Sequence, residues 1–135
     1  MFSRGCQYAI RALVYLAERG EERSHQIKEI AERLDVPYPF LAKVTQSLVA
    51  RGLVSSQKGP GGGVRLARDP SKIFLSEVVE AVDGPRSVQG CILGLPECGE
   101  EEPCPLHDVW GGMRDRMVGI LEAESLMKLA GREEV

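Results

Sequence analysis

The chain has 135 residues and a mass of 14.8 kDa, the size of one domain of ordinary length. Hydrophobic residues make up 43% and charged residues 27%, which is typical of a folded globular protein and excludes a fully disordered chain. No apolar stretch approaches the roughly 20 residues of a membrane-spanning helix, and the charged N-terminal segment lacks the features of a secretory signal. We therefore expect a cytoplasmic protein without a membrane partner, whose four cysteines stay reduced.

The net charge of −3 is distributed unevenly along the chain. Residues 1–72 contain 12 Lys and Arg against 7 Asp and Glu, whereas residues 73–135 contain 5 against 13. Residues 36–68 contain five basic side chains and no acidic one. A concentrated positive field is typical of a surface that binds a polyanion, although the same charges could simply keep a small domain soluble.

Two helices are predicted before residue 35. Ser3 is a suitable N-cap for a helix from about Arg4 to Arg19, in which apolar residues recur at helical spacing. A short amphipathic helix is expected from about His25 to Leu34. His25 would open that helix as a residue that is solvated or close to a phosphate.

A third helix is expected from about Tyr38 to Arg51, after a break at Asp35–Pro37, and Gly52 would end it. Its inner face would carry Phe40, Leu41, Val44 and Leu48. Two short helices joined by a tight turn, after one supporting helix, form the helix-turn-helix arrangement.

A β-hairpin is predicted directly after these helices. Residues 53–56 and 64–67 read as short strands on either side of a glycine-rich turn at residues 59–63. Helix-turn-helix and hairpin together predict a mainly α, winged-helix DNA-binding domain over residues 1–72.

Residues 73–135 are expected to form a second unit with a helix at Leu75–Val82, a Cys-rich loop at residues 86–105 and a long helix from about Pro105 to Ala123. Loops of this length are usually functional or disordered. The long helix carries an apolar stripe that suits packing against a second copy of the chain, with packing inside one chain as the alternative. The stripe consists of Leu106, Val109, Trp110, Met113, Met117, Ile120 and Leu121.

Three cysteines and a histidine lie close together in the sequence, at Cys91, Cys98, Cys104 and His107. Thiolates and an imidazole can hold a tetrahedral metal or an iron–sulfur cluster. Structural zinc sites more often use a tight Cys-x2-Cys pair, whereas the wide spacing here suits a bulkier cluster. Cys6 lies apart on the first helix, where we expect a small packed residue.

Over essentially its whole length, the chain resembles the Rrf family of bacterial winged-helix transcription regulators, typified by IscR and NsrR. The resemblance is carried by residues 7–9, 27–34, 52–56, 58–63 and 76–83, and by the cysteine and histidine set. It implies a homodimer whose long C-terminal helices cross. It also implies a repressor whose binding to a palindromic operator in double-stranded DNA is controlled by an iron–sulfur cluster that senses redox state, nitric oxide or iron–sulfur status.

The resemblance also implies the cluster ligands. Cys91, Cys98 and Cys104 match the family's three cluster cysteines, with the first gap one residue longer, and His107 matches the histidine of the IscR branch. Gln7 stands where the NsrR branch supplies an acidic ligand from the partner subunit, and a neutral amide is a poor substitute, which favours His107. This set suits [2Fe–2S] more than [4Fe–4S], while a thiol or persulfide switch and a zinc site remain alternatives.

The expected DNA contacts fall into two groups. On the outer face of the third helix, Gln46 can pair with adenine and Lys43 can contact guanine or phosphate. Phosphates are expected to be anchored by Arg51, Arg65 and Arg68. At the hairpin tip, Lys58 would enter a minor groove, as the family's basic wing residue does. The full set is Tyr38, Pro39, Ala42, Lys43, Gln46, Arg51, Lys58, Gly61, Arg65 and Arg68.

Two other classes of function fit the sequence less well. An enzyme using Cys104 as nucleophile and His107 as base would lack an acid to orient the base. A phosphate-binding loop is also not indicated, because the glycine-rich turn is not followed by Gly-Lys-Ser/Thr. A cluster carrier that does not bind DNA would leave unexplained the acid-free segment, residues 36–68, with its five basic side chains. We therefore expect no enzymatic activity.

Overall fold

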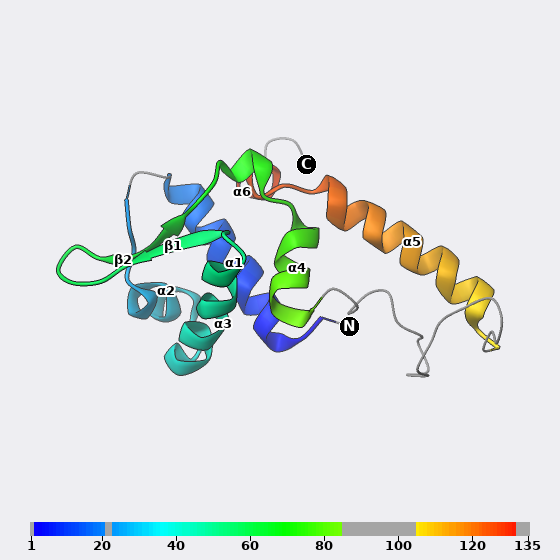
Figure 1. Cartoon of the computed structure of the whole chain (residues 1–135), viewed down its shortest axis with the longest axis horizontal. Helices are drawn as coiled ribbons and strands as arrows, with labels where there is room; N and C mark the ends of the chain where they lie inside the picture. The colour runs from blue at the N-terminus through cyan, green and yellow to red at the C-terminus, as the bar shows by residue number, and fades with distance from the viewer. Residues whose placement is uncertain (1, 21–22, 85–104, 132–135) are drawn as a thin grey trace.

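A computed structural model describes residues 2–20, 23–84 and 105–131. It is mainly helical with one small antiparallel sheet, which confirms the predicted fold class (Figure 1). In chain order, the elements are α1 (Arg4–Arg19), α2 (Ile27–Leu34), α3 (Tyr38–Ala50), β1 (Val54–Gln57), β2 (Gly63–Leu66), the 3-10 helix η1 (Pro70–Lys72), α4 (Leu75–Asp83), α5 (His107–Ala123) and α6 (Leu126–Gly131).

The first helix lies at the centre of the core. Ser3 caps α1 as expected, because its Oγ accepts a hydrogen bond of 3.0 Å from the Cys6 N–H. Leu13 of α1 is fully buried, as are side chains from α3 and α4 such as Leu48 and Val78. These side chains make one continuous core, which supports the three helices that precede the hairpin.

The second helix begins at Ile27, two residues later than predicted, and His25 is not part of it. The His25 backbone instead pairs with Val64 of β2, through N–H to O distances of 2.9 and 2.8 Å. Its side chain is 5% exposed, so the expectation of a solvated histidine is wrong. Backbone pairing with the hairpin turns the ring towards the core, edge-on to Tyr15.

The inner face of α3 is made by Leu41, Val44 and Leu48, as predicted, but Phe40 is 44% exposed. Each residue of a helix advances about 100° around the axis, which places Phe40 at the border of the buried stripe. There its ring meets Tyr8 of α1 edge-on, with the ring centroids 5.4 Å apart.

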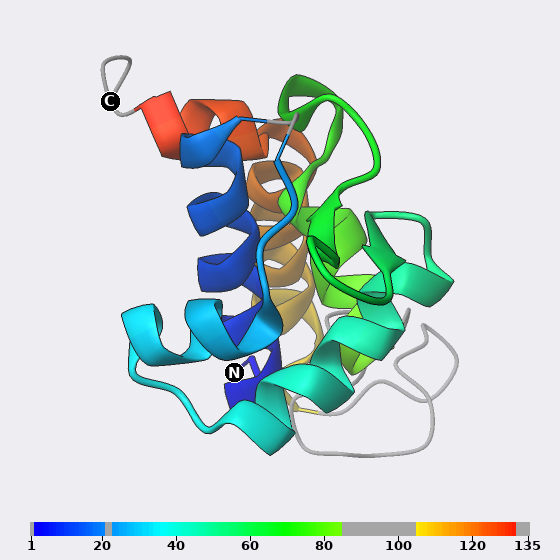
Figure 2. The same ribbon diagram turned by 90° about the vertical axis from the view of Figure 1, so that its left-hand side faces the viewer.

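The short helix α6, which the sequence pattern did not predict, returns to the first helix and packs beside it (Figure 2). Leu126 is fully buried, and its N–H donates to the Ile73 carbonyl oxygen over 2.9 Å. The Leu75 N–H likewise donates to the Glu124 carbonyl oxygen over 3.0 Å. Side chains from both sides of position 72 therefore contribute to one core. The division into a DNA-binding domain (residues 1–72) and a second unit (residues 73–135) stays a prediction.

The long helix α5 projects away from the rest of the molecule (Figure 1). Leu121, near its C-terminal end, is buried with Cys6 of α1 and Val79 of α4. Much of the predicted apolar stripe is exposed, namely Leu106, Val109, Met113 and Ile120. None of the helices within the described ranges combines the length and the apolar character that crossing a membrane requires.

Candidate nucleic-acid interface

The outer face of α3 is the first part of the candidate interface. Tyr38 is 51% exposed, and Pro39, Lys43 and Gln46 are also exposed, whereas Ala42 is half-buried. The face owes its position to Leu41, Val44 and Leu48 on the opposite side, which fix the rotation of the helix. It presents hydrogen-bonding and cationic groups to solvent and no carboxylate.

The hairpin of β1 and β2 is the second part, and it extends from the body as a narrow wing (Figure 1). Gly59 and Gly61 have φ of +90° and +77°, a backbone conformation that side chains with a Cβ rarely adopt. Lys58 and Gly61 are exposed near the tip, and Arg65 is half-buried on β2.

The base of the wing is fixed to the segment before α2. A Cβ on Gly63 would lie 2.3 Å from the His25 carbonyl oxygen, so only glycine allows the two backbones to approach this closely. The His25 Nδ1 lies 2.7 Å from the Glu29 carboxylate, and this hydrogen bond lowers the pKa of Glu29. These contacts therefore attach the wing to the start of the helix-turn-helix.

Between the wing and the start of α2 lies a pocket of about 470 Å³, whose lining includes Arg23, Gln26 and Arg65. The Gln26 side-chain amide donates to the Gly62 carbonyl oxygen over 3.4 Å. Arg23 and Gln26 are candidate phosphate contacts that sequence reasoning missed. Both precede the acid-free segment, so only their proximity to the wing could have identified them.

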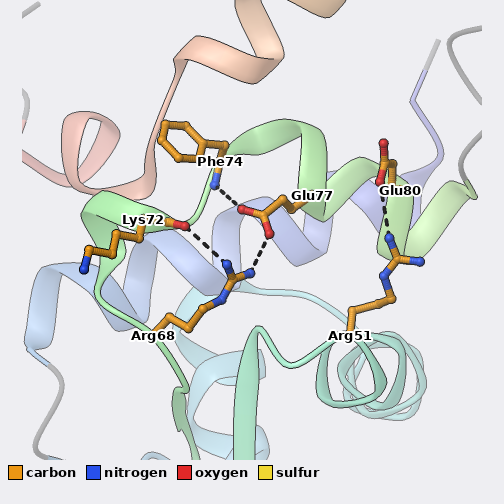
Figure 3. Close-up of polar contacts among 6 residues, drawn as sticks. All are labelled: Arg51, Arg68, Lys72, Phe74, Glu77 and Glu80. Atoms are coloured by element: carbon orange, nitrogen blue, oxygen red, sulfur yellow. Dashed lines mark hydrogen bonds and ion pairs between the residues drawn. The ribbon is translucent and has the colours of Figure 1, made fainter.

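Two of the predicted phosphate anchors are engaged by carboxylates of α4 (Figure 3). The Nη2 of Arg51 donates to the Glu80 Oε2 over 3.2 Å, and the Nη2 of Arg68 donates to the Glu77 Oε2 over 2.6 Å. Two of the five basic residues in residues 36–68 are therefore paired in space with acidic residues from the second half of the chain.

Of the four predicted cluster ligands, the structure describes one. Cys91, Cys98 and Cys104 lie outside the described residues, and His107 is the half-buried first residue of α5. Among the described residues there is no group of three or more potential metal ligands. The donor set itself fits a cluster by its chemistry, because three thiolates and an imidazole are known ligands of iron–sulfur clusters.

Cys6 is separate from this set and is a packed residue, as predicted. Its side chain is fully buried in the contact between α1, α4 and α5. Burial, together with the charge of the nearby Asp83 carboxylate and a hydrogen bond to it, raises the pKa of the Cys6 thiol to about 12.

Comparison with known proteins identifies the family. Residues 2–132 match the Rrf2 family of iron-dependent transcriptional regulators. The transcriptional regulator IscR of Photorhabdus laumondii is 34% identical over 129 residues, which cover 96% of this chain and 78% of that protein.

Solved structures agree with this match. CymR, the global cysteine regulator of B. subtilis, superposes with a TM-score of 0.82 at 25% identity over 98% of this chain and 97% of that one. T. potens IscR superposes with a TM-score of 0.76 at 25% identity over 99% of this chain and 89% of that one. The chain therefore belongs to the Rrf2 family of DNA-binding transcription regulators, which are not enzymes.

Proposed function

We propose that this chain is a homodimeric repressor whose affinity for a palindromic operator is set by an iron–sulfur cluster. The observation that supports DNA reading best is that one fold holds both the exposed, carboxylate-free face of α3 and a basic wing, whose base is fixed by the backbone pairing of His25 and Val64. A protruding helix suits the major groove, and a basic loop suits the minor groove.

In this proposal, the residues divide the work of recognition. Gln46 and Lys43 read base edges from the middle of α3, and Tyr38, Pro39 and Ala42 line the same face at its N-terminal half. Lys58 and Gly61 carry the wing tip into the minor groove, and Arg65 contacts phosphate, which sets position but carries no sequence information.

The cluster would be held by Cys91, Cys98, Cys104 and His107, with [2Fe–2S] favoured over [4Fe–4S]. When bound, the cluster supplies a group whose oxidation or loss reports redox state, nitric oxide or iron supply. The protein's own contribution is to place His107 at the start of α5, a helix that contacts α4 beside the DNA-reading unit.

A regulator of the same fold that responds through free thiols or zinc is the second candidate. The structure supports this second candidate as well as the first, because it resembles CymR at least as closely as T. potens IscR. The TM-scores are 0.82 with CymR and 0.76 with T. potens IscR. The fold alone therefore does not favour a cluster protein over another kind of Rrf2 regulator.

The experiment that tests the proposal compares one protein preparation in two states. The chain is purified without oxygen, its iron, sulfide and zinc are measured, and duplexes that it binds are selected from a random library. We expect visible absorption from a cluster, and an operator affinity that changes about tenfold or more when the cluster is removed. Stoichiometric zinc, or a colourless protein whose DNA binding follows thiol oxidation, would favour the second candidate.

Two variants distinguish a contact that reads a base from one that binds all sequences. Gln46→Ala should relax preference at one base pair, at a cost of about 1–3 kcal/mol. Lys58→Ala should weaken binding to all sequences and reduce the slope of log K against log salt by about 0.9. Equal losses on selected and random DNA for Gln46→Ala would remove Gln46 from the reading set.

A further inference from the structure

Two arginines of the DNA-reading unit are turned towards α4. Arg51 closes the recognition helix α3, and Arg68 follows strand β2 of the wing. Their partners, Glu80 and Glu77, lie three residues apart on α4 and therefore on one face of that helix (Figure 3). Each of these two cations, which the sequence analysis expects to anchor phosphate, is thus paired with a carboxylate of the same chain.

The pair of Arg68 and Glu77 is the more firmly held. Arg68 also donates from Nη1 to the Lys72 carbonyl oxygen over 3.4 Å, and the second carboxylate oxygen of Glu77 accepts from the Phe74 N–H over 3.2 Å. Glu77 thereby caps the start of α4 while it holds the arginine. Both of its oxygens are engaged, which restricts the rotation of the carboxylate.

The pair of Arg51 and Glu80 is simpler. Their side chains are 48% and 44% exposed, so water and salt screen the attraction between them. A phosphate could compete for Arg51 after rotation of its side chain alone. The Glu80 carboxylate acts against this in two ways, because it occupies the guanidinium and repels an approaching phosphate.

We propose that Glu77 and Glu80 are affinity-setting residues that withhold Arg68 and Arg51 from DNA phosphates. The inference rests on the proposed function, because it presumes that α3 and the wing bind DNA. Phosphate contacts carry no sequence information, so the two carboxylates lower affinity for every sequence by a similar factor. The base contacts of α3 then make up a larger share of the binding energy.

The test uses substitutions that remove charge and keep shape. Glu80→Gln and Glu77→Gln both retain an oxygen acceptor, so the amide introduced by Glu77→Gln can still cap α4. Each variant should bind a mixed-sequence DNA duplex about two- to fivefold more tightly than the wild type, the range expected for an exposed ion pair. The slope of log K against log salt should steepen by up to about 0.9 for each arginine released.

Glu32→Gln is the matched control, because it removes the same charge from α2, outside both ion pairs. A gain for Glu80→Gln no larger than that of Glu32→Gln would overturn the inference, since general charge would then explain it. Thermal unfolding shows whether Glu77→Gln is folded, and if it is not, the Glu80 pair is tested alone.

A double-mutant cycle locates the effect on the arginine. If Glu80 withholds Arg51, Arg51→Gln should lower the affinity of the wild type only slightly, through the uncompensated Glu80 charge, and should abolish the larger gain in the Glu80→Gln background. An equal loss in both backgrounds would overturn the inference, because Arg51 would already contact phosphate in the wild type. Failure of the wild type to bind any selected duplex would instead overturn the proposed function.

Discussion

The surroundings of Cys6 determine its chemistry. The side chain is buried between α1, α4 and α5, next to Asp83, whose carboxylate also accepts a hydrogen bond from the Ser3 N–H over 3.1 Å. A thiol in such a place stays protonated at neutral pH and is a poor nucleophile and metal ligand. Burial thus makes Cys6 a poor candidate for the proposed cluster site.

The raised pKa of Cys6 predicts a pH dependence of stability. The folded protein holds the thiol proton up to about pH 12, whereas the unfolded chain releases it near the ordinary value of 9.0. This contribution to stability is complete below pH 9 and is lost as the pH rises towards 12. Cys6→Ala should therefore reduce the fall in the free energy of unfolding between about pH 8 and about pH 10, measured with urea.

The comparison with the wild type removes the effect of other groups that titrate in this range, since both proteins contain them. A cavity left by the smaller side chain lowers stability by the same amount at every pH. An identical alkaline slope in the two proteins would mean that Cys6 does not carry the effect.

Side-chain exposure on α3 could be predicted from helical phase except at Phe40, which was placed inside and is 44% exposed. The ion pairs could not be predicted. Helical phase alone places Lys43 and Gln46 outside and Leu48 inside, and the structure agrees. The carboxylates that engage Arg51 and Arg68 lie 29 and 9 residues further along the chain. Local periodicity and charge counts carry no signal for such contacts, which arise from the packing of α4.

At the scale of elements, the wing depends on its attachment to the segment before α2. Gly63→Ala would place a Cβ 2.3 Å from the His25 carbonyl oxygen at a φ of +132°. We expect a loss of stability of about 2–4 kcal/mol, from the clash and the strained backbone together. The measurement is a urea unfolding curve followed by circular dichroism.

Gly61→Ala is the control, because Gly61 also has a positive φ, of +77°, but nothing within 4 Å of an added Cβ. It should cost only about 1–2 kcal/mol, the backbone penalty alone. Equal losses for the two variants would mean that the contact with His25 does not hold the wing.

The elements differ in how far sequence could define them. The bounds of α1 were predicted from its cap and its apolar spacing, because both signals lie within the helix. The start of α2 was misplaced because the backbone of His25 pairs with Val64, which is distant in sequence. The short helix α6 was missed because its support comes from tertiary contacts, notably Leu126 with Ile73, and not from its own pattern.

At the scale of the whole molecule, α5 presents more apolar surface than one chain covers. Val109 is 66% exposed and Ile120 is 58% exposed, whereas the adjacent Leu121 is 6% exposed. Ile120→Glu should leave the protomer folded and raise the dimer dissociation constant by about a hundredfold or more, since a second copy would bury an unpaired charge. Sedimentation velocity measures the oligomeric state.

Leu121→Glu separates packing within one chain from packing between two. Leu121 lies in the core with Cys6 and Val79, so this variant should lose stability by about 3–5 kcal/mol, irrespective of dimer formation. A folded Ile120→Glu protein that remains a dimer would move the interface away from this face of α5.

The return of α6 to α1 has a consequence for synthesis on the ribosome. Chains emerge from the N-terminal end, so Leu13 and Ile73 leave the ribosome before Leu126, with which they share the core. Cys91, Cys98 and Cys104 are also translated before Leu126. The three cysteines that the proposed cluster requires are therefore in the chain before the core around α1 can be completed.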